Sequence, residues 1–88
     1  MKILQSSVFK RSVKRLHSNQ KRDLDKAVRA ILSDTSKGEE KVGDLSGVLV
    51  YKFKMVKQLT LLAYEIKDDS LILLALGSHE NFYRDLKK

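Results

Sequence analysis

Two lysines alternate with apolar residues in the segment VLVYKFKMV, positions 48–56. The apolar side chains at its odd-numbered positions predict a strand with one buried face, so Lys52 and Lys54 project together from the opposite face. Their side chains leave the backbone roughly 6–7 Å apart, and the two positive charges repel each other unless an anion lies between or above them. A phosphate group suits this position, and a pair of lysines that only keeps a sheet face soluble fits the pattern equally well.

A histidine follows the last apolar run, in the sequence GSHENFY at positions 77–83. If Ser78 caps a terminal helix, His79 lies in its first turn beside amide groups that have no partner within the helix and attract phosphate oxygens. Tyr83 comes four residues later and shares a helical face with His79, so the pair can stack on a base. An ordinary surface position is the alternative for His79, and Phe82 with Leu86 is most simply a core anchor of the same helix.

The net charge of +7 comes entirely from the first third of the chain. Residues 1–30 contain nine lysines and arginines against two aspartates, whereas residues 31–88 contain nine residues of each sign. Such a surface attracts nucleic acid, ribosomal RNA or an acidic protein, and charge alone does not choose among these partners or exclude a merely solvated helix face. The candidate contacts to RNA or the ribosome are Lys10, Arg11, Lys14, Arg15, Lys21, Arg22, Lys57 and Arg84.

The composition excludes several other kinds of site. The chain has no cysteine, which rules out disulfides and thiolate chemistry and favours a reducing cytoplasm. The two histidines are 62 positions apart, and there is no zinc-ligand cluster, nucleotide-binding glycine loop or Ser/His/Asp arrangement, so we expect no metal and no cofactor. The longest apolar run, LILLALG, is far shorter than the roughly 20 residues of a membrane span, and the first residues lack the apolar centre of a signal peptide. We expect a cytoplasmic protein with no membrane partner.

Hydrophobic periodicity predicts a single α+β domain over residues 1–88, in the order β-α-α-β-β-β-α. MKILQS is expected to form the first strand. A helix over SVFKRSVKRLH, capped by Ser6 or Ser7, and a second over NQKRDLDKAVRAILSD, capped by Asn19, follow as an antiparallel hairpin. Residues 34–47 hold three of the four glycines and are predicted to be a loop.

Three strands and a short helix complete the predicted order. After VLVYKFKMV, the segments QLTLLAYEI and SLILLALG are predicted to be strands joined by a tight turn at KDD, with a terminal helix over HENFYRDLKK. SLILLALG is apolar on both faces and is therefore expected near the centre of an antiparallel sheet. Because the helical hairpin covers one face, the other face, with Lys52 and Lys54, is expected to be at least partly open.

In the order and spacing of these elements, the chain resembles the RelE/ParE superfamily of bacterial type II toxin–antitoxin toxins over almost its whole length. The resemblance rests on the basic helical hairpin, on DLSGVLVYKFK and LLAYEI, and on a strand that closes on glycine before a short helix. GSHENFY is similar to the ending of the YafQ-like branch. The fold of the family agrees with the periodicity.

The resemblance implies an mRNA interferase, which cleaves messenger RNA in the ribosomal A site by attack of the ribose 2′-hydroxyl on the adjacent phosphate. The products are a 2′,3′-cyclic phosphate and a 5′-hydroxyl. By this match, one of Lys52 and Lys54 supports proton abstraction and the other stabilises the phosphate. His79 would be the general acid or base, and Tyr83 would orient the substrate.

This chain differs from RelE at one implied site residue, and the resemblance leaves an alternative function open. RelE has an arginine early in the next strand where this chain has Leu61, so Arg84, Lys57 or a ribosomal group would have to replace that cation. The alternative function is ParE-like poisoning of DNA gyrase by binding alone, in which the lysines and the histidine are ordinary surface residues. Either function implies a cognate acidic antitoxin that wraps the helical hairpin and the sheet, which suits the basic excess of residues 1–30.

Overall fold

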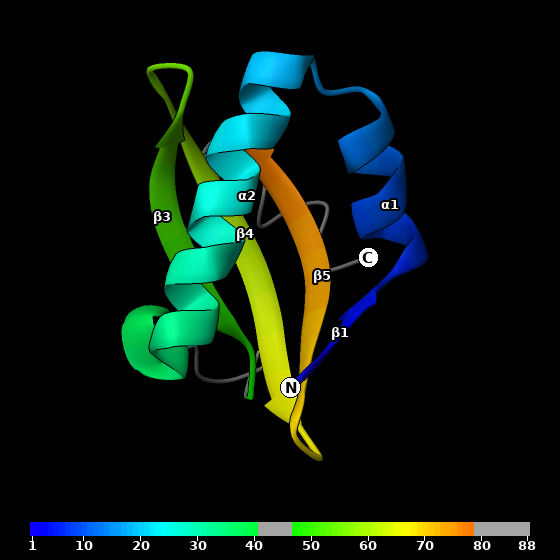
Figure 1. The fold of residues 1–88 in the computed structure, drawn as a ribbon, viewed down its shortest axis with the longest axis vertical. Coiled ribbons are helices and arrows are strands. Elements are labelled where there is room, and N and C mark those ends of the chain that lie inside the picture. Colours follow the sequence, from blue (N-terminus) through cyan, green and yellow to red (C-terminus); the bar gives the residue numbers. More distant parts are fainter. Residues whose placement is uncertain (41–46, 79–88) are drawn as a thin grey trace.

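The fold is a layer of two helices on one face of a β-sheet (Figure 1). The computed structural model describes residues 1–40 and 47–78, in which five strands form one sheet in the order β1-β5-β4-β3-β2. The elements are β1 (Lys2–Gln5), α1 (Ser7–Lys14), α2 (Ser18–Ser33), the 3₁₀ turn η1 (Thr35–Lys37), β2 (Glu39–Glu40), β3 (Leu49–Met55), β4 (Gln58–Lys67) and β5 (Ser70–Ser78). The predicted α+β architecture is confirmed, while the terminal helix predicted for HENFYRDLKK lies outside the described residues.

The sheet is mixed rather than wholly antiparallel. β1 runs parallel to β5, whereas the β5–β4, β4–β3 and β3–β2 pairs are antiparallel. The two central strands, β4 and β5, carry the largest share of buried apolar side chains, as the double-sided apolar pattern of β5 predicts. The α1–α2 hairpin and the β2–β4 segment lie between β1 and β5 in the chain and provide the long connection that a parallel pair needs.

Helix α1 begins at a serine whose side chain forms hydrogen bonds to both the helix and the sheet. The Ser6 hydroxyl accepts a hydrogen bond from the Phe9 backbone N–H at 3.0 Å, which confirms Ser6 as one of the two predicted caps. The same hydroxyl donates to the Leu74 carbonyl at 2.6 Å, and the Ser6 N–H donates to the Leu73 carbonyl at 2.9 Å. One residue therefore fixes the start of α1 against the middle of β5.

The carbonyl that Ser6 binds belongs to a β-bulge. Ala63 of β4 pairs with Ala75, but the next residue, Tyr64, pairs with Leu73, so Leu74 has no partner of its own on β4. A bulge leaves the extra residue outside the regular ladder. The Ser6 hydroxyl therefore supplies a donor at a point where the sheet does not.

Helix α2 begins at Ser18, and its N-cap lies two residues before the predicted one. His17 is the N-cap residue, and its N–H donates to the Gln20 side-chain oxygen at 2.8 Å. The predicted cap, Asn19, is wrong, because glutamine at the third helical position satisfies the cap residue and places Asn19 inside the first turn. From there Leu24, Ala27 and Ile31 form the buried stripe of the helix.

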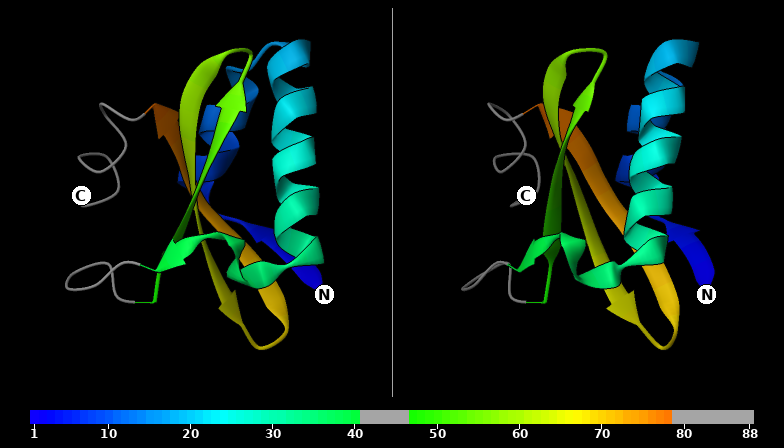
Figure 2. Two further views of the ribbon diagram at one scale, coloured as in Figure 1. Left: turned by 90° about the vertical axis from the view of Figure 1, so that its left-hand side faces the viewer. Right: turned by 60° about the vertical axis from the view of Figure 1, so that its left-hand side comes forward.

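The two faces of the sheet have different cores. Figure 2 shows both helices on the same side of the sheet, where α1 contacts β5 and α2 contacts β3. Beneath them lies the main cluster, whose fully buried members are Ile31, Leu62, Tyr64 and Leu71. A second, smaller cluster on the opposite face consists of Val50, Leu61, Ala63 and Ala75. Among the described residues, no helix is both long and apolar enough to cross a membrane.

The segment predicted to be a loop contains two short elements. Residues 35–37 form η1, and Glu39 and Glu40 pair with Val50 and Leu49 as β2. The loop prediction is wrong for these residues, because two polar residues show no periodicity and their pairing depends on a partner elsewhere in the chain. Residues 41–46 lie outside the description.

A buried tyrosine hydroxyl holds this segment to the sheet. The Tyr64 hydroxyl donates to the Thr35 carbonyl at 2.8 Å and accepts from the Gly38 N–H at 2.9 Å. A Cβ atom at residue 38 would lie 2.5 Å from the same hydroxyl oxygen, so the close approach requires glycine. Burial raises the pKa of Tyr64 above its usual value of 10.0.

We expect Tyr64→Phe to lower the free energy of unfolding by about 1–3 kcal/mol, because the Gly38 N–H and the Thr35 carbonyl lose their partner. Urea denaturation followed by circular dichroism measures the change. The matched control is Tyr51→Phe, which removes the hydroxyl of a half-buried ring and is expected to change stability by less than about 0.5 kcal/mol.

The same pair of proteins tests the pKa of Tyr64. Since the folded state raises this pKa, the unfolded state loses its proton first, and the stabilisation that Tyr64 provides declines as the pH rises above about 10. The stability difference between wild type and Tyr64→Phe should therefore be constant from pH 7 to 9 and shrink at higher pH. A difference that stayed constant up to pH 11 would contradict the assigned burial effect.

Candidate functional site

The candidate site is the exposed pair of lysines on β3. Tyr51 and Phe53 lie on the helix side of this strand, with their rings stacked 6.1 Å apart at 15°. Lys52 and Lys54 alternate with them, and both are exposed on the opposite side of the sheet. We call this side, defined by Lys52, Lys54 and the smaller apolar cluster, the lysine face. The predicted common direction of the two lysines is confirmed.

The lysine face combines charge with a buried apolar floor. Lys52 pairs across the strands with Leu61, and Lys54 pairs with Leu59. Leu61 is 0% exposed, whereas Leu59 is 43% exposed, so the floor is closed beside Lys52 and open beside Lys54. The expectation of a partly open face is confirmed at the lysines, while the apolar cluster next to them is buried.

Leu61 occupies the position where the resemblance implies an arginine. Its side chain is packed with Val50, Ala63 and Ala75 and contributes no charge. Lys57, one proposed replacement, is exposed at the tip of the β3–β4 hairpin, two residues beyond the end of β3. The other, Arg84, lies outside the described residues together with His79 and Tyr83.

An acidic residue on the same strand lies far from the lysines. Glu65 shares the face of Leu61 on β4 but comes four residues later, which places it roughly 13 Å farther along the strand. Within the described residues no group of three or more histidines, aspartates and glutamates is arranged to hold a metal ion. On β2, Glu39 pairs with Val50 of the same cluster, so this side of the sheet carries an acidic residue as well as the two ammonium groups.

The basic residues of the helices lie in the other layer. α1 and α2 cover the face opposite the lysines, so their exposed cations are separated from Lys52 and Lys54 by the sheet (Figure 2). The basic residues that the sequence offers as candidate contacts therefore lie on two separate surfaces, one on each side of the sheet. The helix-layer cations named as candidates are Lys10, Arg11, Lys14, Arg15, Lys21 and Arg22.

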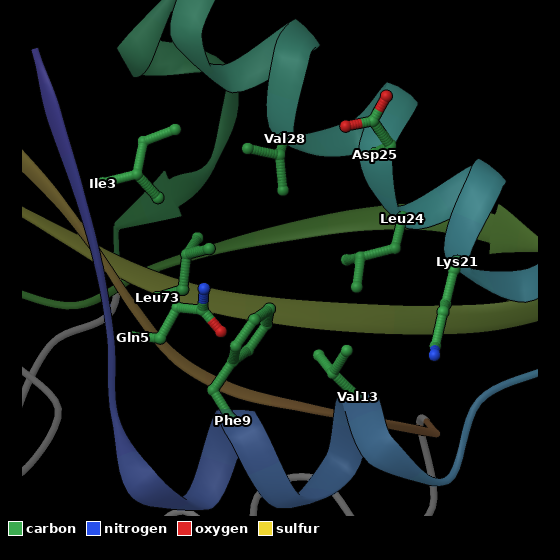
Figure 3. Close-up of a pocket in the computed structure, with 9 residues that line it drawn as sticks. All are labelled: Ile3, Gln5, Phe9, Val13, Lys21, Leu24, Asp25, Val28 and Leu73. Atoms are coloured by element: carbon green, nitrogen blue, oxygen red, sulfur yellow. The ribbon is translucent and has the colours of Figure 1, made fainter.

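An apolar groove opens between the helices and the edge strand β1, which sequence analysis did not anticipate. It has a volume of about 270 Å³. Figure 3 shows Phe9 and Val13 of α1 pointing into it from one side and Leu24 and Val28 of α2 from the other. The available signal is the exposed apolar Ile3 of β1, which lines the groove. The remaining lining residues are Gln5, Lys21, Asp25 and Leu73.

A smaller cavity of about 170 Å³ lies where α1 ends above the β3–β4 hairpin. Arg15 lines it together with Met55 and Ser78, the last described residue before His79. Arg15 is thus the helix-layer cation that the structure brings to the end of β5.

The sequence matches a known family over nearly its whole length. Residues 3–87 fit the family model described as a ParE-like toxin of type II bacterial toxin–antitoxin systems. The chain belongs to this family. The predicted RelE/ParE membership is therefore confirmed, and the protein is the toxin component of a type II toxin–antitoxin system.

Solved structures share the fold at low sequence identity. The toxin of the intact Escherichia coli RelBE toxin–antitoxin complex is 16% identical, with a TM-score of 0.69 over 88% of this chain and 94% of that one. The YoeB/ParE toxin of Agrobacterium tumefaciens is 14% identical, with a TM-score of 0.73 over 90% and 99%. A YafQ mutant from E. coli is 17% identical, with a TM-score of 0.61 over 89% and 92%. No curated protein sequence matches the chain.

We expect replacement of both Lys52 and Lys54 by alanine to change the free energy of unfolding by no more than about 0.5 kcal/mol, because both side chains are exposed. Binding of a short single-stranded RNA should weaken, and the slope of log K against log salt should fall by roughly 0.7 per lysine removed. Urea denaturation and fluorescence anisotropy at several salt concentrations measure the two effects.

The matched control replaces Lys26 of α2 and Lys67, two exposed lysines away from Lys52 and Lys54, since Lys67 comes six residues after Leu61, the partner of Lys52, on β4. This control removes the same charge and should retain most of the affinity. An equal loss in both double mutants would show that net charge, rather than the lysine face, binds the RNA.

Proposed function

We propose that this toxin is a ribosome-dependent mRNA interferase that cleaves messenger RNA by attack of a ribose 2′-hydroxyl on the adjacent phosphate. The observation that carries the proposal is the exposure of Lys52 and Lys54 side by side on the face that the helices leave uncovered. Two fixed cations on a rigid strand suit a phosphodiester better than a neutral ligand, because the anion relieves their mutual repulsion.

In the proposed reaction the 2′-oxygen forms a bond to phosphorus as the bond from phosphorus to the 5′-oxygen breaks. One proton leaves the 2′-hydroxyl, and one is delivered to the 5′-oxygen, so no metal or water is consumed in this step. One of Lys52 and Lys54 supports removal of the first proton, and the other stabilises the negative charge on the phosphate. His79 acts as the general acid or base, and Tyr83 orients the substrate.

The expected sizes of the catalytic contributions favour RNA cleavage that depends on the ribosome. Correctly placed acid–base groups contribute roughly 10²–10⁴-fold, whereas loss of one charge-stabilising contact costs about 2.7–4 kcal/mol. Leu61 provides no such contact, so positioning of the mRNA, and a cation from Lys57, Arg84 or the ribosome, must supply the remainder.

The two basic surfaces would allow the toxin to bind mRNA on one side and the ribosome on the other. If the lysine face receives mRNA, the cations of α1 and α2 remain free on the opposite layer to contact ribosomal RNA. The proposed ribosome contacts are Lys10, Arg11, Lys14, Arg15, Lys21 and Arg22.

A second candidate function is ParE-like inhibition of DNA gyrase without RNA cleavage. It is favoured by the description of the matched family as ParE-like. In this case the basic helix layer serves a protein or DNA surface, and Lys52, Lys54 and His79 have no role in bond breaking.

We expect His79→Ala to abolish growth inhibition and to remove the codon-phased mRNA cuts that the wild-type toxin produces, because it removes the proposed proton donor or acceptor. Inducible expression followed by mapping of mRNA ends and measurement of plasmid supercoiling separates the two functions. His17→Ala is the matched control, since it replaces the other histidine, exposed at the start of α2. Full toxicity of His79→Ala with altered supercoiling and intact mRNA would sink the interferase proposal.

We further propose that a cognate acidic antitoxin binds this toxin. Residues 1–30 supply the complementary charge, and the groove between α1, α2 and β1 offers an apolar site for a segment of that partner. The antitoxin is expected to mask Lys52, Lys54 and His79, or to displace the C-terminal helix predicted from the sequence.

We expect Lys52 and Lys54 to be protected from acetylation in the antitoxin complex, because the partner covers the lysine face. Mass spectrometry after brief treatment with acetic anhydride measures the reactivity of each lysine. Exposed Lys67, at the far end of β4, is the internal control and should react equally in the free toxin and the complex. An inactive complex in which Lys52 and Lys54 react as in the free toxin would count against direct masking.

A further inference from the structure

The tip of the β3–β4 hairpin has an unfavourable backbone conformation. Met55 pairs with Gln58, so the turn contains only Val56 and Lys57, with φ angles of 50° and 70°. A two-residue turn of this type needs both residues in the left-handed region, where glycine and asparagine are preferred. Valine is especially poor there, because its branched Cβ crowds the backbone. Val56 is 43% exposed, so burial of its side chain does not compensate.

An aspartate of α2 contacts the backbone at this point. The Val56 N–H donates to the Asp23 side-chain oxygen Oδ2 at 2.8 Å, across 33 residues of sequence. Hydrogen bonds to a carboxylate are roughly twice as strong as neutral ones. Asp23 is half-buried, whereas its neighbour Asp25 is exposed and pairs with Arg29 at 3.0 Å on the helix surface. The two acidic residues of α2 thus have different partners: Asp25 pairs with Arg29 on the same helix, and Asp23 binds the hairpin.

The turn that Asp23 contacts determines which face Lys52 and Lys54 occupy. With Val56 and Lys57 as the two turn residues, Lys54 pairs with Leu59 and Lys52 with Leu61. A slip of one residue would exchange the two faces of β3 and turn both lysines toward the helices. The turn carries no glycine, and the Asp23 carboxylate supplies a hydrogen bond from outside the hairpin at its first turn residue.

We propose that Asp23 is a positioning residue for the lysine face. Its carboxylate holds the strained turn to α2 and so keeps Lys54 and Lys52 at fixed positions over β4, without touching substrate. An effect of Asp23 on catalysis rests on the proposed RNA cleavage, whereas its effect on the conformation of the turn does not.

The test compares Asp23→Ala with Asp23→Asn, which retains an acceptor oxygen, and with Asp25→Ala, which removes an equal charge from the same helix. Amide hydrogen exchange at residue 56 should be about tenfold faster in Asp23→Ala, as expected for loss of a hydrogen bond to a charged group. It should be nearly unchanged in Asp25→Ala and intermediate in Asp23→Asn, whose neutral amide oxygen still accepts the hydrogen bond but more weakly. In ribosome-dependent cleavage, Asp23→Ala should lower kcat by about tenfold with little change in KM, because the RNA-binding charges remain but are less well placed.

A second comparison keeps the test decisive if Asp23→Ala folds poorly. Val56→Gly removes the crowding at the turn, so adding Asp23→Ala to Val56→Gly should change exchange and kcat less than it does in the wild-type background. Equal effects in both backgrounds, or equal effects of Asp23→Ala and Asp25→Ala, would overturn the positioning role. If the wild-type toxin cleaves no RNA, the interferase proposal fails, and exchange at residue 56 still decides whether Asp23 holds the turn.

Discussion

The register of β3 against β4 is the constraint on which the site depends. Side chains alternate along a strand, so β3, which places the half-buried Tyr51 and Phe53 and the buried Met55 on the helix side, must present Lys52 and Lys54 on the other side. Packing and charge are therefore not independent features of this strand. Any force that keeps the aromatic residues in the core also keeps the two lysines exposed, and the core supplies rigidity that a loop would not have.

Two further contacts hold the chain around the central strands. Ser6 joins the beginning of α1 to the bulge in β5, and the Tyr64 hydroxyl joins β4 to η1 and to Gly38. Each places a polar group where a buried backbone carbonyl or N–H would otherwise lack a partner. The helices, which carry the basic surface, and β2, which borders the lysine face, are in this way both fixed to β4 and β5.

The sequence predicts features that arise from local pattern and misses those that arise from distant contacts. The alternation in VLVYKFKMV, the helical stripe of Leu24, Ala27 and Ile31 and the turn at Asp68 and Asp69 depend on neighbouring residues, and all are present, although Leu32, predicted in the same stripe, is exposed. By contrast, β2 and η1 depend on Val50 and Tyr64, and the glycine-free hairpin tip is contacted by Asp23 from another element. The division of the cations into two layers could not be predicted from charge alone, since charge counts do not say where a helix packs. His79 and Tyr83 remain predictions, because they lie outside the described residues.

The bulge at Leu74 has a consequence for how β5 can change in evolution. One extra residue reverses the parity of every side chain that follows, so that Leu76 packs with the main core while Ala75 and Gly77 lie toward the lysine face, with Gly77 opposite Leu61. The surface beside Lys52 is lined by small residues on β5 for this reason. A single deletion before residue 75 would exchange large and small side chains between the two faces, so this strand tolerates replacement of its residues far better than a change in its length.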